Sequence, residues 1–187
     1  DADRYKKQQF QTFIYNLNQP YLRVAESAFT NISIIDREYF VGLFGDGSFP
    51  DGSLMIDDVE EFMEYQKDFM ESVSTIRKEQ MFTFPVLTYS LLFQEGKFVD
   101  EPFAKWCNKH NNTWYDSNFY IGASVDSLSN CCRLISKFDK LEGFINSIGG
   151  TQLSIGSVKV STLNLHRLAI ESNSDSHYYE LLEEYLN

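Results

Sequence analysis

Two neighbouring segments constrain the fold more than any other part of this sequence. Between residues 59 and 76, apolar side chains recur every three or four positions, which predicts a long amphipathic helix with one buried face. Acidic residues precede this segment and basic residues follow it, as suits the two ends of a helix dipole. The next run, residues 81–93 (MFTFPVLTYSLLF), is almost entirely apolar, and despite Pro85 this is typical of a strand buried on both faces. A helix followed by such a strand favours an α/β fold.

Helices and strands are expected to alternate along the rest of the chain. The residue patterns predict further helices at about residues 5–17 and 100–108, from residue 168 onward, and at 176–186 with Asp175 as its cap. They predict strands at residues 28–35, 118–122 and 157–165, and the strand at 118–122 is expected to be buried. Glycine and proline predict a loop at residues 42–52. We therefore expect an α/β fold with a mainly parallel sheet or barrel.

Composition limits the classes of protein to which the chain can belong. Its 187 residues are 43% apolar and 16% aromatic, which is enough for one domain with a sizeable core. Its net charge of -11 argues against binding to a nucleic-acid backbone or to an anionic membrane surface. No run approaches about 18 apolar residues, and the first residues lack the apolar centre of a signal peptide. We therefore expect a cytoplasmic protein with no membrane or nucleic-acid partner.

The chain has three cysteines, and two of them, Cys131 and Cys132, are adjacent. Three is an odd number, so in a reducing compartment we expect free thiols. Adjacent cysteines cannot both form ordinary disulfides with distant partners without crowding, and they lack the two-residue gap with which a cysteine pair chelates zinc. Two interpretations remain from the residues alone, which are thiol chemistry and the packing of two small buried side chains.

Two other motifs are weaker candidates for a site. Cys107 and His110 have a spacing seen in zinc ligation, but His166 and His177 have no ligand-like neighbours, so we expect no metal site. The run 149–156 (GGTQLSIG) could present backbone N–H groups to a phosphate, although it lacks the lysine of a P-loop and the spacing of a dinucleotide fingerprint. A simple turn is the alternative interpretation of this run.

Several longer strings occur together and in order. They are NQP with the following ESAFTNISIIDREYF, FGDGSFPDG, TFPVLTYSLL, FAKWCNKHN, SVDSLSNCCRL, and FINSIGG with GSVKVSTLNLHRLA. These strings closely resemble the central catalytic region of the anaerobic, class III ribonucleoside triphosphate reductases. The resemblance extends over nearly the whole chain.

The resemblance implies part of a ten-stranded α/β barrel of the ribonucleotide reductase and glycyl radical enzyme type, with residues 1–187 as a single segment of the catalytic barrel domain. A finger loop through the barrel carries a cysteine to the substrate, and here it would be residues 123–134. In the wider superfamily the radical cysteine follows an asparagine and one other residue, which implies Cys132 as the thiyl radical and Asn130 as its polar neighbour. Cys131 remains an alternative. Leu134 stands where aerobic relatives carry a glutamate, which fits the anaerobic type.

The implied activity is reduction of ribonucleoside triphosphates to deoxyribonucleotides by a cysteine thiyl radical, generated from a glycyl radical located outside this chain. Asn31 and Ser129 are candidates to contact the substrate sugar, together with the asparagine of the finger loop. Gly150, Ser154 and Gly156 are candidates to contact the phosphates. Ser154 also stands where formate-using members place an asparagine, so formate and a thiol both remain possible reductants.

The resemblance also implies cofactors and partners beyond these residues. Nothing here resembles the glycyl radical loop or the four-cysteine zinc site, so we expect no cofactor on this segment and expect both groups in the C-terminal part of the full enzyme. The implied partners are the remaining segments of the reductase, a radical-SAM activating enzyme and a second copy in a homodimer of the full enzyme. By itself the segment should be inactive.

Two alternatives remain open. In the first, the chain is a non-catalytic split fragment that completes a partner's barrel. In the second, it is an unrelated thiol enzyme with a polar mechanism, in which Cys132 is the nucleophile and His166 is its base.

Overall fold

The computed structural model describes residues 2–20, 27, 29–125, 127–129, 135–137 and 162–186. These residues belong to two compact units, Asp1–Ser154 and Ile155–Asn187, and each unit is described by itself. The first unit contains the sheet, and the second contains two helices.

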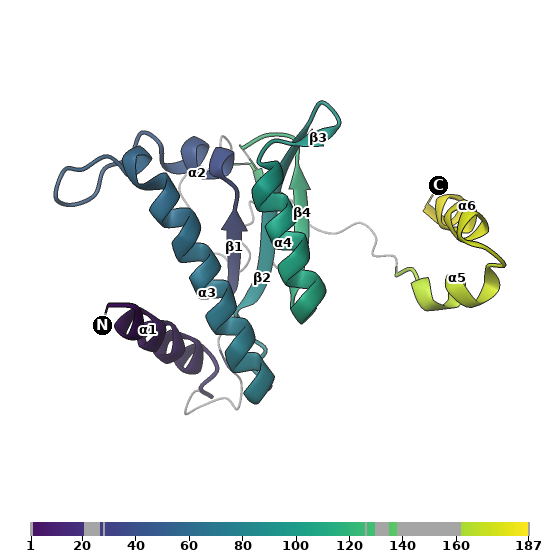
Figure 1. Ribbon diagram of the computed structural model, residues 1–187, viewed down its shortest axis with the longest axis horizontal. Coiled ribbons are helices and arrows are strands. Elements are labelled where there is room, and N and C mark those ends of the chain that lie inside the picture. Colours follow the sequence, from purple (N-terminus) through teal and green to yellow (C-terminus); the bar gives the residue numbers. More distant parts are fainter. Residues whose placement is uncertain are drawn as a thin grey trace. The chain divides into compact units, whose positions relative to one another are not determined.

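A parallel sheet forms the centre of the first unit (Figure 1). Strand β2 (Val86–Gln94) lies between β1 (Asn31–Ile35) and β4 (Ser117–Gly122) and is parallel to both. The short strand β3 (Lys97–Phe98) pairs antiparallel with the end of β2. The expected α/β class and parallel pairing are therefore confirmed for the described strands.

Three helices bury their apolar sides against one face of this sheet. They are α1 (Ala2–Leu17), α3 (Val59–Glu79), which follows the 3-10 turn η1 (Met55–Asp58), and α4 (Glu101–Trp114). The shared core contains fully buried side chains from α1, α3, β2 and α4, among them Ile14, Met70, Leu87, Tyr89 and Cys107. The amphipathic pattern of residues 59–76 thus predicted α3 correctly, and its apolar stripe is the part that the sheet covers.

Helix α2 (Arg37–Phe44) was not expected, and it extends into the region predicted as a loop from residue 42. Asp36 starts this helix, because its carboxylate accepts a hydrogen bond from the backbone N–H of Tyr39 at 3.0 Å. The helix ends at Gly45, where the glycine-rich loop begins. An aspartate directly after a short strand was the available signal for this helix.

Several predicted boundaries also change. Strand β2 begins at Val86, after Pro85, rather than at residue 81, and α4 continues to Trp114, six residues beyond its predicted end. Strand β4 forms as predicted, but it is not fully buried, since Phe119 and Ile121 are 38% and 54% exposed. The ring of Phe119 packs against Tyr89 of the core, with ring centroids 5.1 Å apart, while part of its surface stays exposed.

The second unit contains α5 (Leu165–Glu171) and α6 (Asp175–Leu186), which confirms the two helices predicted in this part of the sequence. Leu165 begins α5 and does not end a strand; residues 157–161 of that predicted strand lie outside the described residues. The cap of α6 is Ser174 and not Asp175, because the Ser174 Oγ accepts a hydrogen bond from the N–H of His177 at 3.2 Å.

The helices that the structure describes include none that is both long enough and apolar enough to cross a membrane.

Candidate active site

The sheet face opposite α1, α3 and α4 carries a row of polar side chains. Ser33 on β1 lies in register with Thr88 on β2, and Thr88 lies in register with Asn118 on β4. In parallel strands such neighbours point to the same side of the sheet. Ser90 and Tyr120 form a second polar pair on this face, two residues further along the strands. Polar positions two apart on three strands therefore make one continuous hydrogen-bonding surface, which we call the polar sheet face.

Asn31, at the start of β1, is the predicted sugar-contacting residue that lies on this face. Its Oδ1 accepts a hydrogen bond from the hydroxyl of Thr88 at 3.3 Å. Thr88 and Ser90 are fully buried, and the Ser90 hydroxyl has no hydrogen-bond partner among the described residues. A buried hydroxyl without a partner is unusual in a folded protein, so Ser90 has hydrogen-bonding capacity to offer to another group.

The polar sheet face offers hydroxyl and amide groups and little charge. Among its described residues on β1, β2 and β4, the phenol of Tyr120 is the one ionisable group. The nearest carboxylate in sequence, Asp36, follows β1 directly but is occupied by the backbone N–H groups of Tyr39 and Leu92, at 3.0 and 2.6 Å. Burial raises the pKa of Asp36, against the opposing effect of these two hydrogen bonds. The described face can therefore orient hydroxyl groups, and it has no carboxylate free for proton transfer.

A small hairpin contacts the same sheet. Strand β5 (Ser127–Ser129) contacts both β2 and β4, and it pairs antiparallel with β6 (Ile135–Lys137), with Ser129 opposite Ile135. The chain that joins these two strands is residues 130–134, which lie outside the described residues. The predicted site residues in that connection are Asn130, Cys131 and Cys132.

The structure thus describes two of the predicted site residues, one on the four-stranded sheet and one on the separate β5–β6 pair that contacts β2 and β4. Asn31 belongs to β1, and the backbone of Ser129 belongs to β5. Gly150, Ser154 and Gly156, the candidates for phosphate contact, lie outside the described residues, as does the cysteine pair.

The third cysteine and its neighbouring histidine belong to the core and not to the polar sheet face. Cys107 and His110 are both buried on α4, and the His110 Nδ1 lies 2.8 Å from the hydroxyl of Tyr89. Burial raises the pKa of the Cys107 thiol and lowers the pKa of His110. Over the described residues, no three His, Cys, Asp or Glu side chains form a group that could hold a metal ion.

Sequence reasoning did not identify Thr88, Ser90 or Asn118 as site residues. The signal was present, because Thr88 and Ser90 are polar members of an apolar run and are two positions apart. That spacing places both side chains on one face of a strand. Asn118 carried no such signal, since its partners come from strands that are distant in the sequence.

The sequence matches the family described as anaerobic ribonucleoside-triphosphate reductase over residues 1–187. Among solved structures, the chain is similar to the anaerobic ribonucleotide reductase from Thermotoga maritima with citrate in the active site, at 45% identity and a TM-score of 0.65. It is similar to the same reductase with glycerol in the active site, at 47% identity and a TM-score of 0.66, and in complex with dATP and CTP, at 46% identity and a TM-score of 0.66. No curated protein matches the chain.

Each of these three matches covers 98% of this chain, but only 32%, 29% and 29% of the respective reductase chains. The chain therefore spans about a third of the length of the structures that it resembles. Because the family match extends over every residue and the identity to solved reductases is about 46%, this chain belongs to the anaerobic ribonucleoside-triphosphate reductase family of oxidoreductases.

Proposed function

We propose that this chain is a single segment of the catalytic barrel of an anaerobic reductase that converts ribonucleoside triphosphates to deoxyribonucleotides. The observation that carries the proposal is the contact of β5 with β2 and β4, which are two of the three strands that carry the polar sheet face. Strand β5 ends one residue before Asn130, so the chain enters the cysteine segment next to the sheet.

Cys132 is the proposed radical residue, with Cys131 as the alternative. In its thiyl form it takes a hydrogen atom from the 3′ carbon of the ribose, which forms an S–H bond and leaves a carbon radical. The 2′ hydroxyl then gains a proton and leaves as water. Formate, which becomes CO2, or a pair of thiols, which becomes a disulfide, supplies two electrons, and with a second proton these place a hydrogen on the 2′ carbon. The S–H group finally returns its hydrogen atom to the 3′ carbon, which restores the thiyl radical. Sulfur and carbon must be held close to contact for the first step, so the chief task of the protein is positioning.

The polar sheet face is suited to that task. Asn31 is the proposed contact to the sugar from β1, with Ser129 and Asn130 as contacts from the hairpin. Amide and hydroxyl groups can hold a ribose by hydrogen bonds without supplying a competing base. The described part of this face carries no carboxylate and no basic side chain, so the sugar would be held there by hydrogen bonds to neutral groups.

The triphosphate is proposed to bind to backbone N–H groups at Gly150, Ser154 and Gly156. One of the similar reductase structures is a complex with dATP and CTP, which is consistent with nucleotide binding in the family. The glycyl radical and a structural zinc are proposed to lie in other parts of the full enzyme. The proposed partners are the remaining reductase segments, a radical-SAM activating enzyme and a second copy of the full enzyme, and the proposed location is the cytoplasm.

The test is a pair of matched substitutions, Cys132→Ser and Cys131→Ser, in the intact reductase. We expect Cys132→Ser to abolish deoxynucleotide formation while the glycyl radical signal in electron paramagnetic resonance stays intact. Cys131→Ser should retain turnover. Full turnover of Cys132→Ser would refute the assignment, and loss in Cys131→Ser alone would move the thiyl to Cys131.

The same samples distinguish the alternative functions. Tight association of the segments with no turnover in the unsubstituted enzyme would support a non-catalytic fragment. Rapid alkylation of Cys132 at neutral pH would support a polar thiol enzyme, since only that mechanism needs a low thiol pKa.

A further inference from the structure

A buried tyrosine on β2 lies within hydrogen-bond distance of a buried histidine on α4. The Tyr89 side chain is 0% exposed, and its hydroxyl lies 2.8 Å from the His110 Nδ1. Both residues belong to the side of the sheet that the helices cover, and no step of the proposed function uses either of them. Imidazole is a base as well as a hydrogen-bonding group, so this pair can also exchange a proton.

The surroundings of His110 determine which ring nitrogen carries the proton. The His110 Nε2 has no hydrogen-bond partner among the described residues and lies 3.7 Å from the Glu71 Oε1 on α3. A carboxylate accepts hydrogen bonds, so the ring proton belongs on Nε2, and Nδ1 accepts from the Tyr89 hydroxyl. Burial lowers the pKa of His110 and raises the pKa of Tyr89. At neutral pH the imidazole is therefore uncharged and the phenol keeps its proton.

This arrangement suits the loss of one electron from Tyr89. A phenol that loses an electron becomes a very strong acid, so its oxidation is favoured by a base at hydrogen-bond distance. The His110 Nδ1 is such a base, and the imidazolium that forms faces the Glu71 carboxylate, which stabilises its positive charge. A backbone carbonyl would also satisfy the buried hydroxyl, but it could not hold the proton.

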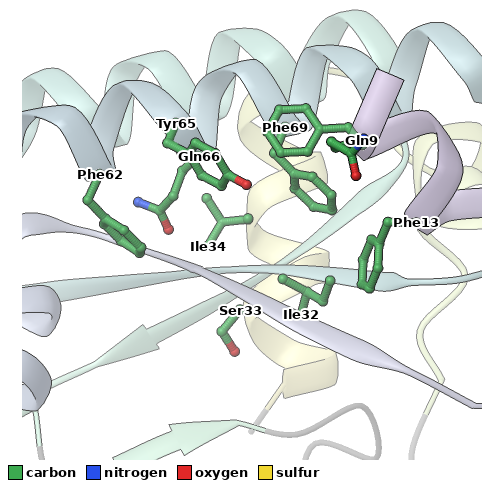
Figure 2. Close-up of a pocket in the computed structure, with 10 residues that line it drawn as sticks. Gln9, Phe13, Ile32, Ser33, Ile34, Phe62, Tyr65, Gln66 and Phe69 are labelled. Carbon is green, nitrogen blue, oxygen red and sulfur yellow. The ribbon is translucent and has the colours of Figure 1, made fainter. Parts of the chain in front are cut away.

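Electrons reach this pair more readily than solutes do. The apolar pocket of about 440 Å³ between α1, β1 and α3 is lined by side chains such as Phe13 and Ile32, and neither Tyr89 nor His110 lines it (Figure 2). The partly buried Trp106 connects the pair with the surface of α4 instead. Its ring stacks on His110 with centroids 5.1 Å apart and lies edge-on to Tyr89 at 6.4 Å. An electron can cross aromatic contacts of this kind.

Tyr89 is also close to the polar sheet face, because its neighbours in β2, Thr88 and Ser90, point to that face. We propose that Tyr89 is a redox-active tyrosine that takes up the oxidising equivalent of a thiyl radical which has not found a substrate. The thiyl radical gains one electron and becomes a thiolate. Tyr89 loses that electron, its phenol proton passes to the His110 Nδ1, and a neutral tyrosyl radical remains beside an imidazolium. The thiyl radical as oxidant rests on the proposed function, whereas the oxidation of Tyr89 with His110 as its base does not.

The test is photo-oxidation of the intact reductase in its resting form with tris(bipyridine)ruthenium(II) and persulfate, followed by rapid freezing and electron paramagnetic resonance. Ring-deuterated tyrosine identifies a tyrosyl signal by the narrowing of its lines. We expect a long-lived tyrosyl component that is lost in Tyr89→Phe. The matched control Tyr115→Phe removes a hydroxyl from a side chain that is 79% exposed, and it should retain this component. An unchanged signal in Tyr89→Phe, or a tryptophanyl signal alone in the unsubstituted enzyme, would overturn the proposal.

Two variants test His110 as the proton acceptor. A hydrogen bond to the oxygen of a tyrosyl radical lowers the largest g value of its high-field spectrum. His110→Phe keeps an aromatic ring but removes the base, so the Tyr89 signal should be lost or its largest g value should rise. An unchanged signal with an unchanged g value would contradict His110 as the acceptor.

Glu71→Gln leaves the buried pair in place and changes a side chain that is 57% exposed, so this variant should fold normally. The tyrosyl radical should decay faster in it, because the imidazolium loses the charge that faces it, and an unchanged lifetime would exclude this role of Glu71.

The oxidant is tested in the activated reductase held without substrate, where the same tyrosyl signal should accumulate. Its absence there, despite its presence after photo-oxidation, would reject the thiyl radical as the oxidant. The photo-oxidation test requires neither turnover nor a cysteine substitution, so its failure is separate from failure of the cysteine assignment.

Discussion

Asp36 is a buried carboxylate that holds two separate backbone groups of the first unit, so its removal should lower the stability of that unit strongly. Its side chain is 1% exposed, and its two oxygens accept hydrogen bonds from Tyr39 N–H at 3.0 Å and from Leu92 N–H at 2.6 Å. One bond caps α2, and the other joins the end of β1 to β2. Asp36→Ala removes both at once.

The expected magnitude follows from the two bonds. Loss of an N-cap costs about 0.5–2 kcal/mol, and a buried N–H left without an acceptor costs about 1–3 kcal/mol. Desolvation of the carboxylate offsets part of this, since burial raises its pKa. We therefore expect Asp36→Ala to lower the free energy of unfolding by about 2–4 kcal/mol. With a urea slope of about 2 kcal/mol per molar, the midpoint falls by about 1–2 M.

Asp58→Ala is the matched control for urea denaturation followed by circular dichroism. Asp58 occupies the N-cap position of α3, but its side chain makes no capping hydrogen bond. Its carboxylate lies at the N-terminus of the helix dipole, an interaction worth less than about 1 kcal/mol, so its removal should cost less than that of Asp36. If Asp36→Ala costs no more than Asp58→Ala, then the buried carboxylate does not hold α2 and β2 together, and the reasoning is wrong.

Three further predictions concern the core and its surroundings. Burial lowers the pKa of His110 in the folded state, so unfolding takes up a proton, and stability should fall as the pH drops from about 6.5 to below the lowered pKa. In the double variant Tyr89→Phe/His110→Phe, urea denaturation across this pH range should no longer show the slope, and a slope that persists would contradict the prediction. The buried Cys107 thiol, whose pKa is raised, should react with iodoacetamide on the order of 100-fold more slowly in the native chain than in urea, as mass spectrometry of the modified peptide can show; equal rates would refute its burial. Arg37 forms ion pairs with Glu60 and with the buried Asp100, so Arg37→Gln should lower the free energy of unfolding by about 1 kcal/mol. Glu60→Gln should lower it less, because Glu60 is largely exposed, and the reverse order in urea denaturation would exclude Asp100 as the main partner.

Local patterns in the sequence predicted the helices and strands of the first unit well, and long-range partners explain the errors. The stripe of α3 is repeated every three or four residues, so its faces could be assigned without knowledge of the sheet. Helix α2 depends on Asp36, and one of the two backbone N–H groups that the Asp36 carboxylate binds belongs to Leu92, 56 residues away. The exposure of Phe119 and Ile121 depends on what lies over β4, which no local pattern contains.

The residues of the candidate site also fall into two groups, those that could be predicted from the sequence and those that needed the structure. The adjacent cysteines were noticeable from the residues alone, the family resemblance supplied their proposed role and that of Asn31, and the family match confirms the resemblance. The assignment of Cys132 itself stays a prediction, because residues 130–134 lie outside the described residues. Thr88 and Asn118 could be joined to Asn31 only through the register of three strands.

Gln66 shows why a polar residue inside an apolar stripe is informative. The sequence places it on the buried side of α3, where an amide without partners would cost about 1–3 kcal/mol. Its position therefore predicts that a backbone edge lies opposite, since a free backbone N–H and carbonyl together match an amide. The structure supplies that edge at Ile35, 31 residues earlier in the chain. The same amide uses both backbone groups of Ile35 on the side away from β2, so one side chain satisfies its own polar atoms and those of the end of β1.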